Sequence, residues 1–311
     1  MKKQLLIVTG VLVSGLLNAQ VANRAAKIPN KLANIAVLKS NKADDKLLNA
    51  PIPFQTKGQV AAKKSQQRVS AITEVVIGNS YYDLQTNSSI GDRIVLNADG
   101  TIATCWTFES TADGGVYNNR GTGYAYYNGS AWSAAPTAKV ENARVGWGNV
   151  VNTRSGRELI LSHNGTTSKM HVASRSAKGN GVWANSETVL PTANSGGNYW
   201  PRMVTSSVSG GDTIYAVSLT YPTTGTPPGQ VYQGLDGAVV FSRSINQGVS
   251  WDIVNQVPDG LTSTDFIGHG PDTYAIAAKG STVVIATGDN GKDLVLTKST
   301  DAGATWTAKT V

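Results

Sequence analysis

Six residues with side chains suited to binding a polar ligand stand at or just before the start of short, β-rich segments of this 311-residue chain. They comprise two tryptophans, two arginines, one asparagine and one aspartate. Aromatic faces beside a few fixed hydrogen-bonding groups are typical of sites for sugars and carboxylates. The alternative is that the polar groups only hydrate a channel and that the tryptophans only cover loops. The candidate ligand-binding residues are Arg93, Trp147, Asn149, Trp200, Arg202 and Asp272.

No catalytic or metal-binding set is recognisable in the sequence. His163, His171 and His269 lie in different parts of the chain, without the spacing of metal ligands. No glycine-rich phosphate loop precedes a helix. Hydrolysis of a glycoside needs two carboxyl groups across the scissile bond. Asp92 and Asp272 are a possible pair, but spacing alone does not show that they face one another. We therefore expect no metal and no cofactor, and we assign no catalytic residue.

An internal repeat of short strands positions the six candidates. Four tryptophans, Trp132, Trp183, Trp251 and Trp306, follow one another at spacings of 51, 68 and 55 residues. Three β-rich segments separated by Gly, Asn and Asp turn signals precede each tryptophan. The segments are 92–96, 101–108 and 122–127; 147–151, 158–162 and 169–173; 201–205, 213–219 and 238–242; and 272–276, 282–286 and 293–297.

This repeat predicts the fold. Three short strands and a tryptophan-bearing fourth, repeated every ~50–60 residues, form the blade of a β-propeller. The fold class is therefore all-β, a β-propeller of four-stranded blades with four blades visible in residues 72–311. The first strand of each blade is expected to line the central axis. Segment 282–286 is apolar on both faces, which predicts a sheet between two neighbouring sheets. Segment 72–77 is a possible outer strand of the last blade, where it would close the ring.

Two of the four units carry a recognisable turn motif. Ser299 to Trp306 matches the Asp-box pattern Ser-x-Asp-x-Gly-x-Thr-Trp at every fixed position, and Ser244 to Trp251 matches it with Asn and Ser replacing Asp and Thr. The acid or amide accepts backbone N–H groups of a tight turn, and the glycine permits a positive φ. The residues to which we assign this structural role are Ser244, Asn246, Gly248, Trp251, Ser299, Asp301, Gly303 and Trp306.

On these motifs, residues 80–311 resemble the sialidase-like β-propellers with Asp-box (BNR) repeats. The layout also looks like that of secreted Bacteroidetes proteins that use type IX secretion, although no C-terminal sorting domain is visible. The resemblance implies a propeller of usually six blades, and we expect the four visible here to be part of a six-bladed or larger propeller. The alternative is that four blades close into a ring by themselves. It also implies that Asp boxes lie on the outer rim, away from any site at the centre.

Sialidase chemistry, as the resemblance implies it, uses three arginines, a Tyr–Glu nucleophile pair and an aspartate. Arg93 and Arg202 are possible members of the arginine set, and Arg144 is a third, out of register. The four glutamates of residues 80–311, Glu109, Glu141, Glu158 and Glu187, show no pairing with a tyrosine of a loop that leads into a blade. We therefore expect a non-catalytic binding or scaffold propeller for an extracellular glycan or surface protein. The alternative is a sialidase-type glycoside hydrolase acting on extracellular glycans.

The start of the chain predicts export. Lys2 and Lys3 precede a mostly apolar run from 5 to 17, and Ala19 is a plausible cleavage position. The run is shorter than the roughly 20 residues that a membrane-spanning helix needs. We expect a signal peptide at 1–19, a low-complexity linker or pro-region at 20–71, and a secreted protein with no membrane span.

Charge and cysteine content exclude further classes. Residues 1–75 hold 12 Lys and Arg against 3 Asp and Glu, whereas the remainder holds 15 against 17. The basic character therefore belongs to the leader and linker, and the folded part lacks the basic face of a nucleic-acid-binding domain. The single cysteine, Cys105, permits no intramolecular disulfide, and its β-rich surroundings predict a buried, inert thiol.

Overall fold

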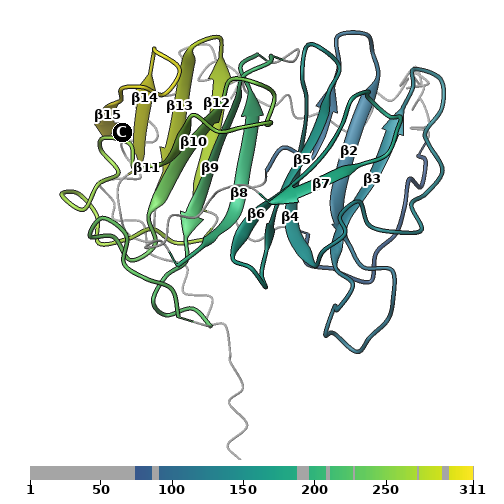
Figure 1. Cartoon of the computed structure of the whole chain (residues 1–311), viewed down its shortest axis with the longest axis horizontal. Coiled ribbons are helices and arrows are strands. Elements are labelled where there is room, and N and C mark those ends of the chain that lie inside the picture. The colour runs from purple at the N-terminus through teal and green to yellow at the C-terminus, as the bar shows by residue number, and fades with distance from the viewer. Residues whose placement is uncertain are drawn as a thin grey trace, which may run out of the picture. The chain divides into compact units, whose positions relative to one another are not determined.

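The computed structural model describes residues 74–85, 91–187, 196–207, 211–226, 228–271, 273–288 and 294–310. The chain divides into two compact units, Met1–Ala71 and Ile72–Val311, and all described residues belong to the second. Its regular structure in these ranges consists of β-strands (Figure 1). They contain no helix with the length and apolar character needed to cross a membrane.

The strands form four antiparallel sheets, each a meander in chain order. The first sheet comprises β1 (Ile94–Leu96), β2 (Ile102–Phe108) and β3 (Gly121–Tyr127); the second comprises β4 (Val145–Asn152), β5 (Glu158–Asn164), β6 (Lys169–Arg175) and β7 (Ala184–Glu187). The third comprises β8 (Asn198–Thr205), β9 (Ile214–Thr220), β10 (Val239–Ser244) and β11 (Ile253–Gln256); the fourth comprises β12 (Tyr274–Lys279), β13 (Thr282–Thr287), β14 (Val295–Ser299) and β15 (Thr307–Thr310).

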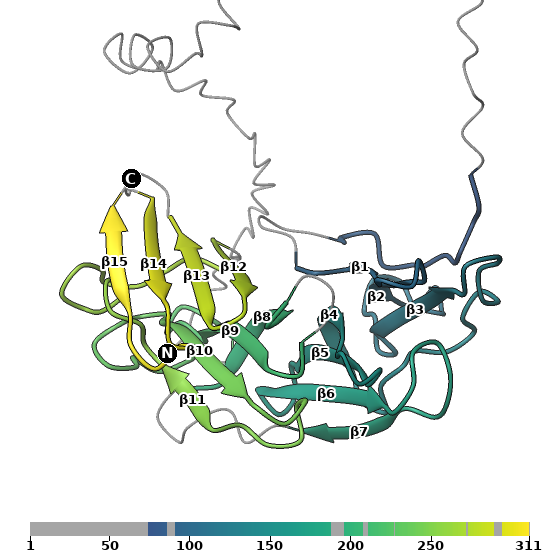
Figure 2. The ribbon, with the colours of Figure 1, turned by 90° about the horizontal axis from the view of Figure 1, so that it is seen from above.

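The four sheets lie side by side around an arc with their first strands innermost (Figure 2). Strand β4 packs beside β2 and β8, and β8 packs beside β12. One cavity is lined by all four inner strands, β1, β4, β8 and β12. The predicted all-β propeller architecture is confirmed, and the inner strands meet at its centre. The first sheet has three strands rather than four, because its outer position holds only an isolated bridge between Tyr127 and Trp132.

Apolar side chains between neighbouring sheets form the core. Tyr215 and Phe241 of the third sheet pack with Ile285 of the fourth in the largest cluster. Each such fully buried side chain contributes about 1.5–3 kcal/mol relative to exposure. Cys105 lies in the smaller cluster between the first and second sheets, and burial raises the pKa of its thiol to about 12. This thiol is therefore protonated at neutral pH, in line with the expected inert role.

Two expectations about the edges of the propeller are wrong. Along β13, Val283 and Ile285 are buried, whereas Val284 and Ala286 are half-buried, so this sheet has one covered face and one face that no described sheet covers. By contrast, β5 and β9 are buried along their whole length. The described part of segment 72–77, residues 74–77, forms no strand. The outer position of the fourth sheet is held by β15, which pairs with β14.

The turns β10–β11 and β14–β15 hold the eight residues of the turn motif. In the second turn, the Ser299 hydroxyl accepts the Gly303 N–H at 2.7 Å, and Asp301 Oδ1 accepts the Thr305 N–H at 2.9 Å. Hydrogen bonds from Thr305 lower the pKa of Asp301 to about 2. In the first turn, Ser244, Asn246, Gly248 and Ser250 take the corresponding positions. Trp306 packs inward in the core cluster, and its indole N–H donates to the Gly303 carbonyl at 3.1 Å, while Trp251 packs in the cluster between the second and third sheets.

The glycine of this motif provides a test of the turn. Gly303 has φ 89° and Gly280 has φ 60°, so alanine at either position costs about 1–2 kcal/mol of backbone strain. A Cβ at Gly303 would also collide with the buried Phe241 ring, whereas a Cβ at Gly280 meets open space. We expect Gly303→Ala to destabilise the protein by about 1–3 kcal/mol more than Gly280→Ala. Urea denaturation of both variants measures the difference, and equal losses would contradict the proposed packing.

Candidate functional site

The two candidate tryptophans stand at the same irregularity in neighbouring inner strands. The register of β4 against β5 shifts between Gly146 and Asn149, and that of β8 against β9 shifts between Tyr199 and Arg202. Trp147 and Trp200 lie inside these bulges with φ values of 55° and 50°. A left-handed backbone costs about 1–2 kcal/mol for a residue other than glycine. Bulges of this kind redirect side chains and are frequent beside functional sites.

The bulges place both indole rings in one aromatic cluster, which we define as Trp147, His163, Tyr199, Trp200 and Tyr221. The Trp147 ring stacks on His163 at 5.3 Å and 20°, and His163 meets the Trp200 ring edge-on at 5.9 Å. Tyr221 stacks on Tyr199 at 4.1 Å and lies 6.0 Å from Trp200. His163 and Tyr199 are buried, whereas both tryptophans and Tyr221 are partly exposed. The buried His163 and Tyr199 therefore support aromatic rings that are partly exposed to solvent.

A buried arginine extends the cluster toward the first sheet. The Arg120 guanidinium lies 5.1 Å from the Trp147 ring and 5.3 Å from the Tyr82 ring. Its Nε donates to the Val145 carbonyl at 3.0 Å, which fixes its position. Burial lowers the pKa of Arg120, but an arginine stays charged at physiological pH. A cation held against aromatic faces stabilises their orientation.

His163 links the two tryptophans as a neutral ring. Its Nδ1 accepts the Trp200 backbone N–H at 3.2 Å. Burial, together with the positive charges of Arg120, Arg144 and Arg202, lowers the pKa of His163 to about 3. The hydrogen bond to Nδ1 requires the tautomer with its proton on Nε2. His163 therefore acts here as a spacer and acceptor, and it carries no proton to a ligand at neutral pH.

This depressed pKa predicts a pH dependence of stability. In the unfolded chain His163 binds a proton near its ordinary pKa of 6.5, whereas in the folded chain it does so only near 3. Below pH 6.5 the unfolded state thus binds more protons, and the protein should lose up to about 1.4 kcal/mol of stability per pH unit as pH falls toward 3. His163→Gln should remove this contribution. Denaturation curves between pH 7 and 4 measure it, and parallel slopes for the two proteins would contradict the assignment.

The structure brings only some of the six candidates together. Trp147 and Trp200 meet through His163. Asn149 is buried, and its amide donates to the Pro201 carbonyl at 2.7 Å and to the Trp147 carbonyl at 3.0 Å. Asn149 therefore joins β4 to β8 and does not face a ligand.

The structure does not bring the charged candidates together in one site. Arg202 is buried beneath the bulge, where its Nη1 donates to the Pro201 carbonyl at 3.0 Å. Arg93 instead lies beside the first sheet and donates to Gln85 Oε1 at 3.1 Å. Asp272 lies outside the described residues. Arg144 donates to the Tyr117 carbonyl at 2.8 Å.

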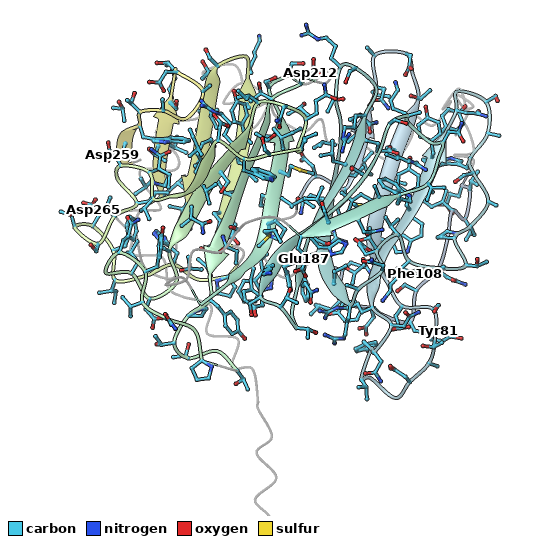
Figure 3. All side chains as sticks on the ribbon, viewed as in Figure 1. Tyr81, Phe108, Glu187, Asp212, Asp259 and Asp265 are labelled. Carbon is cyan, nitrogen blue, oxygen red and sulfur yellow. The ribbon has the colours of Figure 1, made fainter. Side chains whose placement is uncertain are left out.

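The four glutamates of residues 80–311 all bond to other residues. Glu109, Glu141 and Glu158 are buried and accept hydrogen bonds from neighbouring loops and strands. Glu187 lies on β7, the outermost strand of the second sheet, where it accepts from Thr167 at 2.7 Å (Figure 3).

One of these glutamates pairs with a tyrosine that lies on strand β3 and not in a loop that leads into a blade. The Tyr124 hydroxyl donates to Glu158 Oε1 at 2.8 Å, and Arg175 Nη2 lies 2.6 Å from Glu158 Oε2. This group lies between the first and second sheets, on strands other than the inner ones. Burial raises the pKa of Tyr124, and the neighbouring Glu158 raises it further. Tyr124 is therefore a poor nucleophile, and the pair is a structural ion-pair network.

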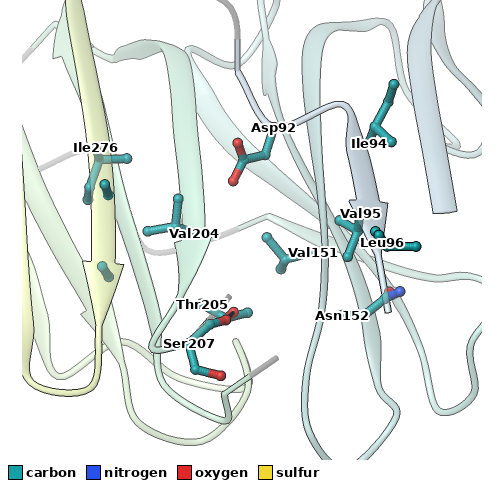
Figure 4. A pocket seen from close by; sticks show the side chains of 12 residues that line it. Asp92, Ile94, Val95, Leu96, Val151, Asn152, Val204, Thr205, Ser207 and Ile276 are labelled. Carbon is teal, nitrogen blue, oxygen red and sulfur yellow. Dashed lines mark hydrogen bonds between the residues drawn. The ribbon is translucent and has the colours of Figure 1, made fainter. Parts of the chain in front are cut away.

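A cavity of about 340 Å³ occupies the axis between the inner strands (Figure 4). Most of its described lining is aliphatic, and among these residues Asp92 supplies the one carboxylate. Asp92 reaches solvent in the channel, but the surrounding walls partly desolvate it and raise its pKa. No cluster of three metal-ligating side chains exists among the residues that the structure describes.

Comparisons with known proteins give distant matches among solved structures. No protein-family model and no curated protein matches the chain. Among solved structures, a protein of unknown function from Dyadobacter fermentans gives a TM-score of 0.46 at 12% identity, covering 75% of this chain and 71% of that one. A family 117 glycoside hydrolase from Zobellia galactanivorans gives 0.46 at 12%, with 74% and 72% covered. The NanB sialidase from Streptococcus pneumoniae gives 0.46 at 11%, with 79% and 56% covered.

Sequence reasoning missed the residues that support the tryptophans. His163, Tyr199, Tyr221 and Arg120 come from strand ends and from the loops between second and third strands. Their positions in the repeat are the one feature of the sequence that points to these residues. Tyr221 directly follows β9, and His163 lies near the end of β5. The distances in the cluster arise from packing between sheets and are not encoded in local spacing.

Proposed function

We propose that the protein is an exported, non-catalytic β-propeller that binds glycans on the aromatic cluster. The observation that carries the proposal is the pair of partly exposed indole rings at equivalent bulges of β4 and β8, joined by the buried His163. The left-handed backbones of Trp147 and Trp200 at equivalent positions support the proposal that these rings are oriented for contact with a ligand.

The chemistry of the cluster suits a sugar. The C–H faces of a pyranose ring pack against flat aromatic surfaces, and hydroxyl groups then bond to nearby polar groups. Positive charge surrounds the cluster, because it lies near Arg120, Arg144 and Arg202. These three charges contribute to the lowered pKa of His163. The cluster therefore favours glycans that present oxygen acceptors or acidic groups toward the second and third sheets.

The binding role is preferred to hydrolysis because of the carboxyl groups. Glycoside hydrolysis usually requires two of them across the scissile bond. Glu109, Glu141, Glu158 and Glu187 accept internal hydrogen bonds, and among the described residues Asp92 is the one carboxylate that lines the axial cavity. A sialidase-type hydrolase remains the second candidate, favoured by the raised pKa of Asp92, which suits a general acid.

The export part of the proposal rests on the leader sequence at 1–19, which lies outside the described residues. A glycan ligand is consistent with a protein that acts outside the cell or at its surface. Fractionation of the producing cells, followed by N-terminal sequencing of the secreted protein, tests this part. A mature N-terminus at Gln20 is expected, and retention of Met1 in the cytoplasm would contradict it.

A glycan array and a hydrolysis assay, run on the same preparation, test the function. We expect saturable binding to one class of glycan, with no release of product from that glycan or from a fluorogenic sialoside. Product release that Asp92→Asn abolishes would establish the hydrolase instead. Absence of binding to any glycan on the array would overturn the proposed role.

A further inference from the structure

The axial cavity is separate from the aromatic cluster and has a different chemical character. Its walls come from one segment of each inner strand, including Val95, Val151, Val204 and Ile276. At about 340 Å³ it falls within the range of small-molecule sites, which are mostly apolar with a few placed polar groups. Ile94 and Leu96 of β1 are 70% and 66% exposed, so apolar surface on this wall faces solvent.

The polar side chains in the described lining of the cavity are Asp92, Asn152, Thr205 and Ser207. Figure 4 shows Asp92 at one end and Thr205 and Ser207 at the other, with Val151 and Val204 between them. The described residues that line the cavity include no lysine, arginine or histidine, whereas Arg202 lines a smaller adjoining pocket that shares Asp92, Val204 and Ile276 with it. Within its described lining, the cavity is therefore an apolar chamber with one negative charge near one end.

The carboxylate of Asp92 has no partner among the described residues. No hydrogen bond or ion pair joins its side chain to them, although its backbone carbonyl accepts the Val150 N–H at 2.8 Å. Its pKa is raised by desolvation alone, without the lowering that a nearby cation would cause. A partly desolvated carboxylate gains most from a ligand that brings a positive charge and N–H donors.

We propose that the axial cavity binds a small organic cation, an ammonium group carried on a short hydrocarbon chain. The ammonium group pairs with Asp92, and the hydrocarbon packs against Val151, Val204 and Ile276. A neutral chain of the same length loses the ion pair, and a carboxylate-bearing chain meets the like charge of Asp92. This site is independent of the proposed glycan site, because the two share no residue.

Titration calorimetry with hexylammonium, hexan-1-ol and hexanoate tests the proposal. We expect saturable binding of hexylammonium, weaker binding of hexan-1-ol and no binding of hexanoate. A hydrogen bond to a charged group is worth about 1.5–3 kcal/mol, so Asp92→Asn should weaken hexylammonium binding about ten- to hundredfold and leave hexan-1-ol unchanged. Val204→Phe, which fills the chamber, should abolish both.

Asp265→Asn is the matched control for charge. Asp265 is exposed and lies at the periphery of the molecule, away from the inner strands, and its replacement removes the same charge (Figure 3). It should leave hexylammonium binding unchanged, as should Trp200→Gly at the aromatic cluster. Equal affinities of hexylammonium for wild type and Asp92→Asn would overturn the proposal, and so would an equal loss in Asp265→Asn. Failure of glycan binding with intact hexylammonium binding would refute only the proposed glycan function.

Discussion

Replacement of Trp200 by glycine should reduce affinity for the bound glycan by about 30-fold or more. Aromatic anchors at the centre of a binding surface typically contribute about 2 kcal/mol or more when removed, which corresponds to that factor. Glycine is the informative substitute because it accepts the φ of 50° without strain. The double variant Trp147→Gly/Trp200→Gly should bind no glycan. Calorimetric titration with the glycan identified on the array measures both effects.

The control for this prediction is a tryptophan of similar exposure away from the cluster. Trp132 contacts Tyr127 at 5.5 Å beside the outer strand of the first sheet. Trp132→Ala should therefore leave glycan affinity within twofold of the wild type. Trp200 also packs against the core of the third and fourth sheets, so circular dichroism must show that each variant is folded. Folded Trp147→Gly and Trp200→Gly variants with full affinity would refute the site.

Removal of Arg175 should cause the largest loss of stability. Arg175 is buried and holds the fully buried Glu158 through contacts of 2.6 Å and 2.7 Å. Its guanidinium also lies 4.2 Å from the Trp183 ring. Arg175→Ala leaves a buried carboxylate that keeps neutral donors, among them the Tyr124 hydroxyl and the Gly179 N–H, and no positive charge from Arg175. Breaking a buried pair in this way costs about 3–5 kcal/mol, which urea denaturation at pH 7 measures.

A double variant separates the charge from the packing. In Glu158→Gln/Arg175→Met neither member of the pair is charged, and the methionine keeps most of the apolar volume. Replacement of both partners of a buried ion pair is often close to neutral, so most of the lost stability should return. A loss below about 1 kcal/mol for Arg175→Ala, or no recovery in the double variant, would contradict the buried network.

The sequence was sufficient to locate the strands and the order of the sheets. Segments such as 282–286 and 158–162 lie within β13 and β5, because apolar β-branched runs between glycine and asparagine turns have few alternatives to a strand. Trp147 and Trp200 were recognised as equivalent because the repeat places each at the start of an inner strand. Those two assignments rest on local pattern, which a sequence displays directly.

The other parts of the site depend on contacts between sheets. Nothing near Asn149 in the sequence shows that its amide reaches Pro201 on the next inner strand. Segment 282–286 was expected between two sheets, but apolar composition does not reveal whether a neighbour covers each face. Likewise, the pairing of Tyr124 with Glu158 spans 34 residues and two sheets. Such long-range contacts arise only once the register and the packing of the sheets are fixed.

The indole N–H signals of the seven tryptophans test the central claim in one spectrum. After assignment by single Trp→Phe substitutions, the glycan found on the array is titrated into the ¹⁵N-labelled protein. The signals of Trp147 and Trp200 should shift together and saturate, while those of the other five, Trp106, Trp132, Trp183, Trp251 and Trp306, stay in place. Shifts confined to these five tryptophans, with Trp147 and Trp200 unmoved, would contradict glycan binding at the bulges of the inner strands.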